Sequence, residues 1–503
     1  MSDEMTPEEV REAARRTTEW VADYRERLED LPVLPRVEPG DVAAALPEGP
    51  PREGEPFETI LDDLDEVIVP GLTHWNHPRF FAYFPSSSSP PAVLAEYVAA
   101  ALNQNAMKWR TSPAGTELEE RMADWVRQLV GLPGTFRGVL QDTASSGSFT
   151  SLVAAREALG VEIRGRGMAG RADLPALTLY VSEQAHSSLE KAAIAAGLGH
   201  TGVRKVRADD DFRMDPDALA DGIAEDRAAG RLPVMVCATI GTTSTASVDP
   251  VDRIAEVCRE QDVWLHVDAA YAGPAAMLPE LRDRFAGWER ADSVVLNPHK
   301  WLSTPIDCSV LLFRDPEPFR ASLALTPEYL RSDEQDSTDL MDFGLPLGRR
   351  FRALKLWFLL RWHGADGLRG RLRDHIEWAR GFADRVEDDP RFELVAPPSF
   401  STVVFRALPA PEEGTGGDAD EEGRESARPL ERGEGVDTLA ANELNRDLLD
   451  RVNREGDVFL SHTELAGSYV LRLSVGAVAT RERHVREAWD ALAGAYEALE
   501  GGG

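Results

Sequence analysis

The stretch LNPHKW at residues 296–301 places a lysine just after SVVL at 293–296, a short apolar run typical of a buried strand. Only five of the chain's 55 basic residues are lysines, so arginine supplies nearly all of its positive charge. A lysine amine has a tunable pKa and forms Schiff bases, whereas a guanidinium does not. Lys300 is therefore a candidate for a chemical role, with a surface or capping lysine as the alternative.

A second motif, VWLHVDAAYAG at residues 263–273, is an apolar strand that ends on Asp268 and continues in small residues. A carboxylate at the end of a buried strand is costly unless it meets a cation. A protonated pyridine nitrogen would be such a cation, and a helix cap is the alternative reading of Asp268. The two motifs together predict a site at the carboxyl ends of neighbouring strands.

These motifs resemble those of the group II pyridoxal-phosphate-dependent amino-acid decarboxylases, the aromatic-L-amino-acid decarboxylase family of fold type I. The resemblance extends from about Thr17 to Tyr496, except for residues 409–437. It implies a pyridoxal 5'-phosphate cofactor held covalently by Lys300, with Asp268 keeping the pyridine nitrogen protonated. It also implies that the chain releases CO₂ from an L-amino acid and leaves the amine.

The resemblance implies further cofactor contacts. QDTASSGS at residues 141–148 precedes a predicted helix, whose N-terminus favours phosphate. Asp142 departs from the family pattern there, because an acid stands beside a phosphate site. His186 would stack on the ring, with a core histidine as the alternative, and His299 would orient Lys300 or the substrate carboxylate. The predicted cofactor residues are Thr143, Ala144, Ser145, His186, Thr243, Asp268, Ala270, Asn297, His299 and Lys300.

The aromatic segment THWNHPRFFAYFP at residues 73–85 favours tryptophan, tyrosine or phenylalanine as the substrate. A glutamate- or diaminobutyrate-type substrate would need a cation such as Lys108 or Arg110, and an inactive scaffold that binds the cofactor is a further alternative. Arg349 could clamp a carboxylate, as in aminotransferases, but a structural ion pair fits its sequence context better. The resemblance implies that this segment lines the substrate pocket, and the predicted substrate residues are Trp75, Tyr83, Phe84, Pro85, Ser86, Met107 and His186.

Tyr329, in PEYL at residues 327–330, matches a loop tyrosine of the family. The resemblance implies that it returns a proton to the α-carbon after CO₂ leaves, whereas relatives with phenylalanine there tend to make aldehydes by oxidation. The predicted catalytic set is therefore Lys300, Tyr329, His186 and Asp268.

Strand and helix signals alternate along the middle of the chain, which predicts an α/β fold with a mostly parallel sheet flanked by helices. We expect an N-terminal helical dimerisation segment at 1–88, a large cofactor-binding domain at 89–357 and a small α+β domain at 358–503. Residues 409–437 read as a disordered acidic insertion. Because residues 1–85 lack a core of their own, we expect a homodimer with shared active sites.

Three side chains are predicted to cap helices. Thr6 precedes Pro7 at the start of an amphipathic pattern, Thr116 stands three residues before Glu119, and Asp249 precedes Pro250.

The composition of the chain limits the classes of function that it can have. A formal net charge of −32 disfavours nucleic-acid binding, because phosphate backbones would be repelled. No apolar run reaches the ~18 residues of a membrane span, and the acidic N-terminus does not read as a signal peptide. The three cysteines lack metal-binding spacing and read as reduced thiols of a cytoplasmic protein, so no metal is expected. The acidic excess is typical of proteins from halophiles.

Overall fold

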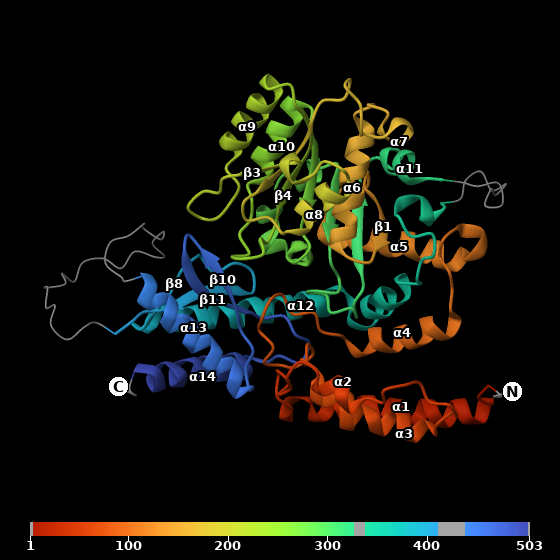
Figure 1. The fold of residues 1–503 in the computed structure, drawn as a ribbon, viewed down its shortest axis with the longest axis vertical. Helices are drawn as coiled ribbons and strands as arrows, with labels where there is room; N and C mark the ends of the chain where they lie inside the picture. Colours follow the sequence, from red (N-terminus) through yellow and green to blue (C-terminus); the bar gives the residue numbers. More distant parts are fainter. Residues whose placement is uncertain (1–3, 326–337, 411–437, 501–503) are drawn as a thin grey trace, which may run out of the picture.

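The computed structural model describes residues 4–325, 338–410 and 438–500. Tyr329 and nearly all of the predicted insertion at 409–437 lie outside these residues. Figure 1 shows three parts: a layer of N-terminal helices, a large domain around one sheet, and a smaller domain that carries the C-terminal helices. No helix in the described ranges is long and apolar enough to cross a membrane.

The large domain is built on a seven-stranded sheet with the order β1-β7-β6-β5-β4-β2-β3. All neighbouring strands are parallel except β7, which runs antiparallel to both β1 and β6. The predicted mostly parallel sheet is confirmed. The strands are β1 Arg137–Gln141, β2 Leu177–Ser182, β3 Val203–Val206, β4 Leu232–Thr239, β5 Trp264–Asp268, β6 Ser293–Leu296 and β7 Ser309–Phe313.

Helices cover both faces of this sheet, because alternate residues of a strand point to opposite sides. On β4, Val236 and Ala238 belong to one core with α5, α9 and α10, whereas Met235 and Cys237 belong to another core with α6 and α8. The helices of this domain are α5 Pro113–Val130, α6 Ala144–Ala158, α7 Ile163–Arg166, α8 Ser188–Ala195, α9 Pro216–Ala228, α10 Val251–Gln261 and α11 Glu317–Leu323.

Of the three predicted caps, only Thr6 is confirmed. It forms a capping box with Glu9 at the start of α1. Thr116 lies inside the first turn of α5, which begins at Pro113, so the prediction for it is wrong. The Asp249 carboxylate instead accepts hydrogen bonds from the backbone N–H groups of Met214 and Thr239, both at 2.7 Å, and burial raises its pKa to about 6.

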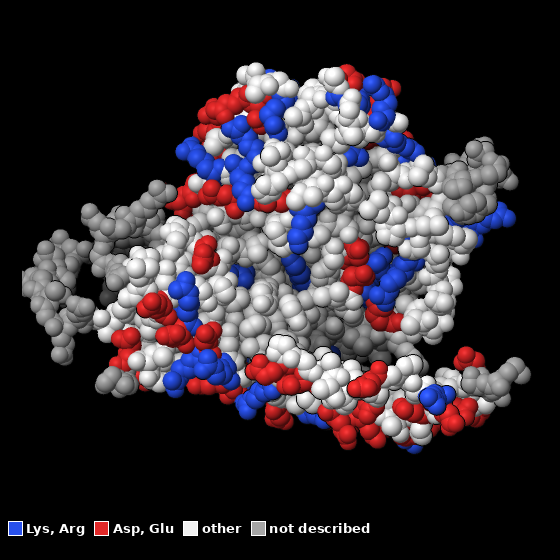
Figure 2. Space-filling view, in the orientation of Figure 1, with Lys and Arg blue, Asp and Glu red and all other residues white. Residues whose placement is uncertain are grey.

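The N-terminal layer consists of α1 Pro7–Arg27, α2 Asp41–Ala45 and α3 Phe57–Asp63. After α3 the chain continues in a π turn from Leu64 and a 3₁₀ turn from Val69. Trp20 donates a hydrogen bond to Asp65 at 2.9 Å, which joins α1 to the segment after α3. No residue of α1 is buried in the chain, and Figure 2 shows a hollow between this layer and the large domain.

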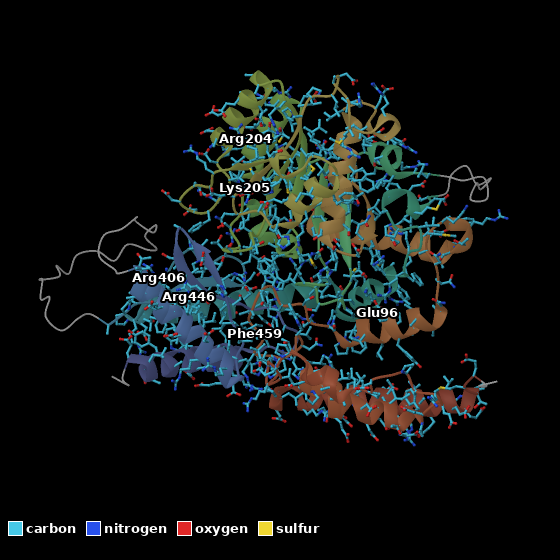
Figure 3. The ribbon with its side chains drawn as sticks, viewed as in Figure 1. Glu96, Arg204, Lys205, Arg406, Arg446 and Phe459 are labelled. Atoms are coloured by element: carbon cyan, nitrogen blue, oxygen red, sulfur yellow. The ribbon has the colours of Figure 1, made fainter. Side chains whose placement is uncertain are left out.

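α4 Pro90–Leu102 and α12 Ala353–Asp388 pack against each other and link the parts. The buried Lys355 of α12 pairs with Glu96 of α4, which Figure 3 labels. α12 is interrupted at Gly364, and it runs across the predicted domain boundary at 357.

The small domain has an antiparallel four-stranded sheet in the order β10-β11-β9-β8, as expected for an α+β domain. Phe459, labelled in Figure 3, packs edge-on against Phe80 and Tyr83, so this domain contacts the N-terminal segment. Its elements are β8 Phe392–Leu394, β9 Thr402–Ala407, α13 Thr438–Glu455, β10 Ser461–Leu465, β11 Ser468–Ser474 and α14 Glu482–Glu500.

Candidate active site

Asp268 and Lys300 lie at one edge of the large sheet. Asp268 ends β5, where it pairs in register with Thr239 of β4 and Val295 of β6, and Lys300 follows the end of β6. The Asp268 carboxylate is buried and accepts a hydrogen bond from the Ala270 N–H at 2.9 Å. The two groups that the sequence motifs singled out are therefore neighbours in the fold.

The surroundings of Lys300 favour a neutral amine. Burial lowers the pKa of Lys300 below its ordinary value; the Asp268 carboxylate opposes this shift and the Arg472 guanidinium adds to it. The Lys300 Nζ lies 5.2 Å from the centre of the Phe84 ring. An amine with a lowered pKa is a better nucleophile at neutral pH, because more of it is unprotonated.

His186 follows β2 and lies within electrostatic range of both groups. Partial desolvation of the ring lowers the pKa of His186. The charge of Asp268 raises this pKa, and the charge of Lys300 lowers it. The Ser188 N–H donates to the His186 Nδ1 at 3.2 Å, and the Ser188 hydroxyl lies 2.8 Å from the same atom. The neutral ring therefore carries its proton on Nε2. The residue is exposed in the segment after β2.

The segment before α6 has the form of an anion site. Thr143 is the N-cap, and its hydroxyl accepts a hydrogen bond from the Ser146 N–H at 3.4 Å. Ala144 and Ser145 begin the helix, where backbone N–H groups lack intrahelical acceptors. The Asp142 carboxylate turns back to accept from the Thr143 N–H at 2.6 Å, which defines the orientation that the sequence left open.

Three further predicted residues lie in the connections after β4 and β6. Asn297 is buried, and its Oδ1 has no hydrogen-bond partner among the residues that the structure describes. His299 accepts a hydrogen bond from the Cys308 N–H at Nδ1, at 3.1 Å, and burial lowers the pKa of His299 to about 4, so the ring is neutral. Thr243 is exposed in the turn after β4.

The predicted substrate residues other than His186 lie in three different surroundings. Phe84 lies beside Lys300, and the Ser86 hydroxyl donates to the backbone carbonyl of His299. Pro85, between them in sequence, lies against Gly476. Trp75 and Tyr83 form an exposed stack with ring centres 5.9 Å apart. Met107 instead accepts a backbone hydrogen bond from Met341, and within the described residues no hydrogen bond or ring contact joins it to Lys300.

Sequence reasoning missed two residues of this site. Tyr271 stacks on Phe84 with ring centres 3.8 Å apart, and its place in the VWLHVDAAYAG motif was a usable signal. Arg472 of β11 is buried, with its Cζ 4.8 Å from the centre of the Phe84 ring. Its only sequence signal was a charged residue inside the apolar run YVLRLSV at 469–475.

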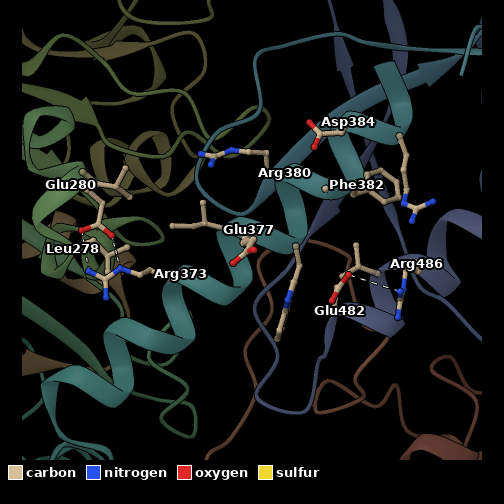
Figure 4. Close-up of a pocket in the computed structure, with 15 residues that line it drawn as sticks. Leu278, Glu280, Arg373, Glu377, Arg380, Phe382, Asp384, Glu482 and Arg486 are labelled. Atoms are coloured by element: carbon tan, nitrogen blue, oxygen red, sulfur yellow. Dashed lines mark hydrogen bonds and ion pairs between the residues drawn. The ribbon is translucent and has the colours of Figure 1, made fainter. Parts of the chain in front are cut away.

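A pocket of about 710 Å³ lies elsewhere, between the segment that contains Leu278 and Glu280 and the helices α12 and α14. Figure 4 shows its charged lining, in which Glu280 pairs with Arg373 and Glu482 with Arg486. None of the predicted site residues lines it, so it is distinct from the candidate active site.

Comparison with known proteins identifies relatives along almost the whole chain. Tryptophan decarboxylase 2 of Oryza sativa subsp. japonica is 40% identical over 97% of this chain and 94% of the relative. Tyrosine decarboxylase 2 of Narcissus pseudonarcissus is 40% identical over 96% of this chain and 93% of the relative. The crystal structure of Catharanthus roseus tryptophan decarboxylase in complex with L-tryptophan matches with a TM-score of 0.88 and 37% identity, covering 99% of this chain and 100% of that one.

The cofactor of these enzymes fits the residues on this sheet edge. They offer a primary amine for the aldehyde of pyridoxal phosphate, a buried carboxylate for its ring nitrogen and a helix N-terminus for its phosphate. A family model, the pyridoxal-dependent decarboxylase conserved domain, matches residues 39–408. The chain therefore belongs to the pyridoxal-dependent decarboxylases and uses pyridoxal phosphate as its cofactor.

Proposed function

We propose that this protein decarboxylates an aromatic L-amino acid to the corresponding amine and CO₂. The observation that carries this proposal is the likeness to tryptophan and tyrosine decarboxylases over nearly the full chain. The aromatic side chains of Phe84 and Tyr271 beside Lys300 support it, because they offer an apolar wall to a planar side chain.

Each functional group of the cofactor has a candidate partner in the chain. Lys300 would hold the aldehyde, Asp268 the ring nitrogen, and the first turn of α6 at Thr143, Ala144 and Ser145 the phosphate. Asn297, Thr243 and Ala270 would contribute hydrogen bonds, and the partnerless Oδ1 of Asn297 supports this role. When bound, the protonated cofactor ring supplies an electron sink for the pair left on the α-carbon as CO₂ departs.

The chain's own side chains would perform the remaining tasks. Lys300 would remain within reach as a base when the substrate is bound, and its lowered pKa suits this task. His186 would cover one face of the cofactor ring. His299, which accepts a hydrogen bond from the Cys308 N–H, would keep a neutral ring beside Lys300 and orient the amine. A neutral ring would not form an ion pair with the substrate carboxylate.

Measurement of product amines across a panel of substrates tests the proposal most directly. The purified enzyme, loaded with pyridoxal phosphate, should release CO₂ and amine from tryptophan, tyrosine or phenylalanine. Glutamate and 2,4-diaminobutyrate should give rates at least tenfold lower. A preference for either of these would support the alternative substrate class, and no turnover of any amino acid would favour a scaffold that only binds the cofactor.

A second candidate reaction is oxidative conversion to an aldehyde, favoured by one relative. Phenylacetaldehyde synthase of Arabidopsis thaliana is 39% identical over 96% of this chain. Tyr329 argues for the amine, because the proton donor of the amine-forming enzymes is expected at this position. Oxygen consumption during turnover distinguishes the reactions, since amine formation consumes none.

The functional unit in this proposal is a homodimer with shared active sites. α1 buries none of its residues in the chain, and α4 exposes Leu94, Tyr97 and Leu102. Trp362 on α12, the helix that packs against α4, is 74% exposed. Such large apolar patches mark protein interfaces. A second copy would also be needed to bring Met107 to a substrate pocket.

Two matched variants test the dimer. Leu94, 52% exposed on α4, and Ile194, 54% exposed on α8, are both large apolar side chains. Leu94→Asp should produce monomers in sedimentation velocity and lose most activity, whereas Ile194→Asp should remain dimeric and active. Monomeric wild-type enzyme with full activity would refute the proposal. The cytoplasm is the proposed compartment, supported by three buried free cysteines.

A further inference from the structure

Arg472 is a buried cation whose described partners are all neutral. Its side chain on β11 belongs to a residue only 4% exposed. Its Nε donates to the Ser244 carbonyl at 2.8 Å, and its Nη1 to the Tyr83 carbonyl at 3.2 Å and to the Ser461 hydroxyl at 3.4 Å. No acidic side chain in the described part of the chain pairs with it. A buried charge without a counter-ion costs several kcal/mol, which points to a role other than stability.

The hydrogen bonds of Arg472 join three separate parts of the active site. Ser244 follows Thr243 in the turn after β4, and Tyr83 precedes Phe84 in the N-terminal aromatic segment. β11 itself belongs to the small domain. Because a planar guanidinium presents five N–H donors in a rigid fork, it can hold several acceptors at fixed positions, which a lysine cannot do.

Arg472 and Lys300 share the Phe84 ring. The Arg472 Cζ lies 4.8 Å from the ring centre and the Lys300 Nζ lies 5.2 Å from it. The two cationic groups are therefore at most about 10 Å apart, a distance over which like charges interact by about 1–2 kcal/mol at an effective dielectric constant of ~20. Tyr271 stacks on the Phe84 ring and so restricts its movement away from the two cations.

Among the residues that the structure describes, four charged or titratable groups interact electrostatically with the Lys300 amine. Asp268 comes from β5, His186 from the segment after β2, His299 from the loop of Lys300 itself, and Arg472 from β11. The pKa values of both histidines are lowered, so they are neutral at neutral pH. The fixed charges are thus one carboxylate and one guanidinium, and the guanidinium contributes to the lowered pKa of Lys300.

We propose that Arg472 is a positioning residue: it holds Phe84 and the Ser244 turn against Lys300 and provides a fixed positive charge beside the amine. This inference rests on the proposed function of Lys300 as the attachment point of the cofactor. It assigns the small domain a direct part in preparing Lys300, which is a residue of the large domain.

The test follows how cofactor-free enzyme captures pyridoxal phosphate, measured by the visible absorbance of the lysine-linked cofactor across a pH series. Capture needs the neutral amine of Lys300. Arg472→Met should raise the pH midpoint of capture by about one unit, because removal of a like charge raises the amine pKa. Arg472→Lys should keep the midpoint but lower kcat about tenfold or raise KM, since one ammonium cannot bond all three segments.

Arg284→Met is the matched control. Arg284 also lies over a phenylalanine, Phe400, at 4.5 Å and donates to a serine, Ser399, but only burial affects its pKa. Its removal should leave the midpoint unchanged even if it lowers the melting temperature. An unchanged midpoint in folded Arg472→Met, or wild-type kcat and KM in Arg472→Lys, would overturn the inference. If Arg472→Met does not fold, the kcat and KM of Arg472→Lys alone test the inference. Capture by wild type at a lysine other than Lys300 would instead refute the proposed function.

Discussion

At the scale of single residues, Asp268 offers the cleanest isosteric test. Asparagine keeps the shape of Asp268 and an oxygen for the Ala270 N–H but removes the negative charge. If the charge keeps the cofactor nitrogen protonated, Asp268→Asn should bind the cofactor and lose about 10²–10³-fold in kcat. Steady-state kinetics with saturating cofactor measure the loss. A variant with near wild-type kcat would show that the electron sink does not depend on this carboxylate.

Tyr329 lies outside the described residues, so its role stays a prediction from the sequence. A phenol can return a proton to the α-carbon after CO₂ leaves, and phenylalanine cannot. Tyr329→Phe should therefore bind cofactor and substrate normally, lose most amine formation and begin to consume oxygen, yielding aldehyde, ammonia and peroxide. Product analysis with an oxygen electrode measures both paths. If this variant forms amine at the wild-type rate, His186 becomes the better candidate for the proton donor.

The position of the candidate residues at strand ends was predictable from the sequence, whereas their roles stay predictions. Asp268 ends β5, and Lys300 and His186 follow β6 and β2 of the same sheet. Parallel strands bring their carboxyl ends to a common edge. Arg472 could not be predicted in the same way. It reaches the site only because β11 of another domain packs beside the N-terminal aromatic segment, and no local spacing encodes that contact.

At the scale of secondary-structure elements, the predicted structural ion pair of Arg349 is confirmed. Arg349 pairs with Glu119 of α5, and both side chains are buried. Glu119 also accepts from the Leu140 N–H at 2.8 Å, while Arg349 donates to the Leu140 carbonyl at 2.7 Å. The pair thus anchors α5 and the segment before α12 to β1.

Glu119→Gln should destabilise the fold strongly, because it leaves the Arg349 charge buried without compensation. Loss of one partner of such a pair costs about 3–5 kcal/mol in the free energy of unfolding. Urea denaturation measures this, with Glu455→Gln as the control. Glu455 pairs with Arg451 on the exposed surface of α13, so its loss should cost no more than about 0.5 kcal/mol. Equal effects of both changes would contradict the anchoring role.

Elements were predictable where their signals are local. Apolar runs located β5 and β6, but the antiparallel direction of β7 was not anticipated. Only residues 297–308 separate it from β6, and a parallel crossover needs a helix that this stretch does not contain. Asp249 was misread as a cap because its carboxylate serves two buried N–H groups, one of them 35 residues away in sequence.

At the scale of the whole molecule, the net charge of −32 predicts that salt stabilises the fold. Figure 2 shows acidic side chains gathered along the N-terminal helical layer. Salt shortens the screening length from about 10 Å at ~0.1 M to about 3 Å at ~1 M, which weakens their mutual repulsion. The melting temperature and activity should rise from dilute buffer towards molar KCl.

Sucrose at matched osmolality is the control for the effect of salt, because sucrose is excluded from protein surfaces but does not screen charge. Equal melting temperatures in ~0.1 M and ~2 M KCl would contradict a screening effect. The division of the chain into domains at residues 88 and 357 stays a prediction from composition and patterning. The helix α2 within residues 34–56 was not predicted, because Pro- and Gly-rich segments carry no periodic signal.

The most direct test of the account asks which residue carries the cofactor. The wild-type enzyme is loaded with pyridoxal phosphate, reduced with borohydride, digested and analysed by mass spectrometry. The chain has only five lysines, so the result is unambiguous. We expect a pyridoxyl group on Lys300, and loss of both visible absorbance and turnover in Lys300→Ala. A pyridoxyl group on Lys355 or another lysine, or wild-type turnover in Lys300→Ala, would contradict it.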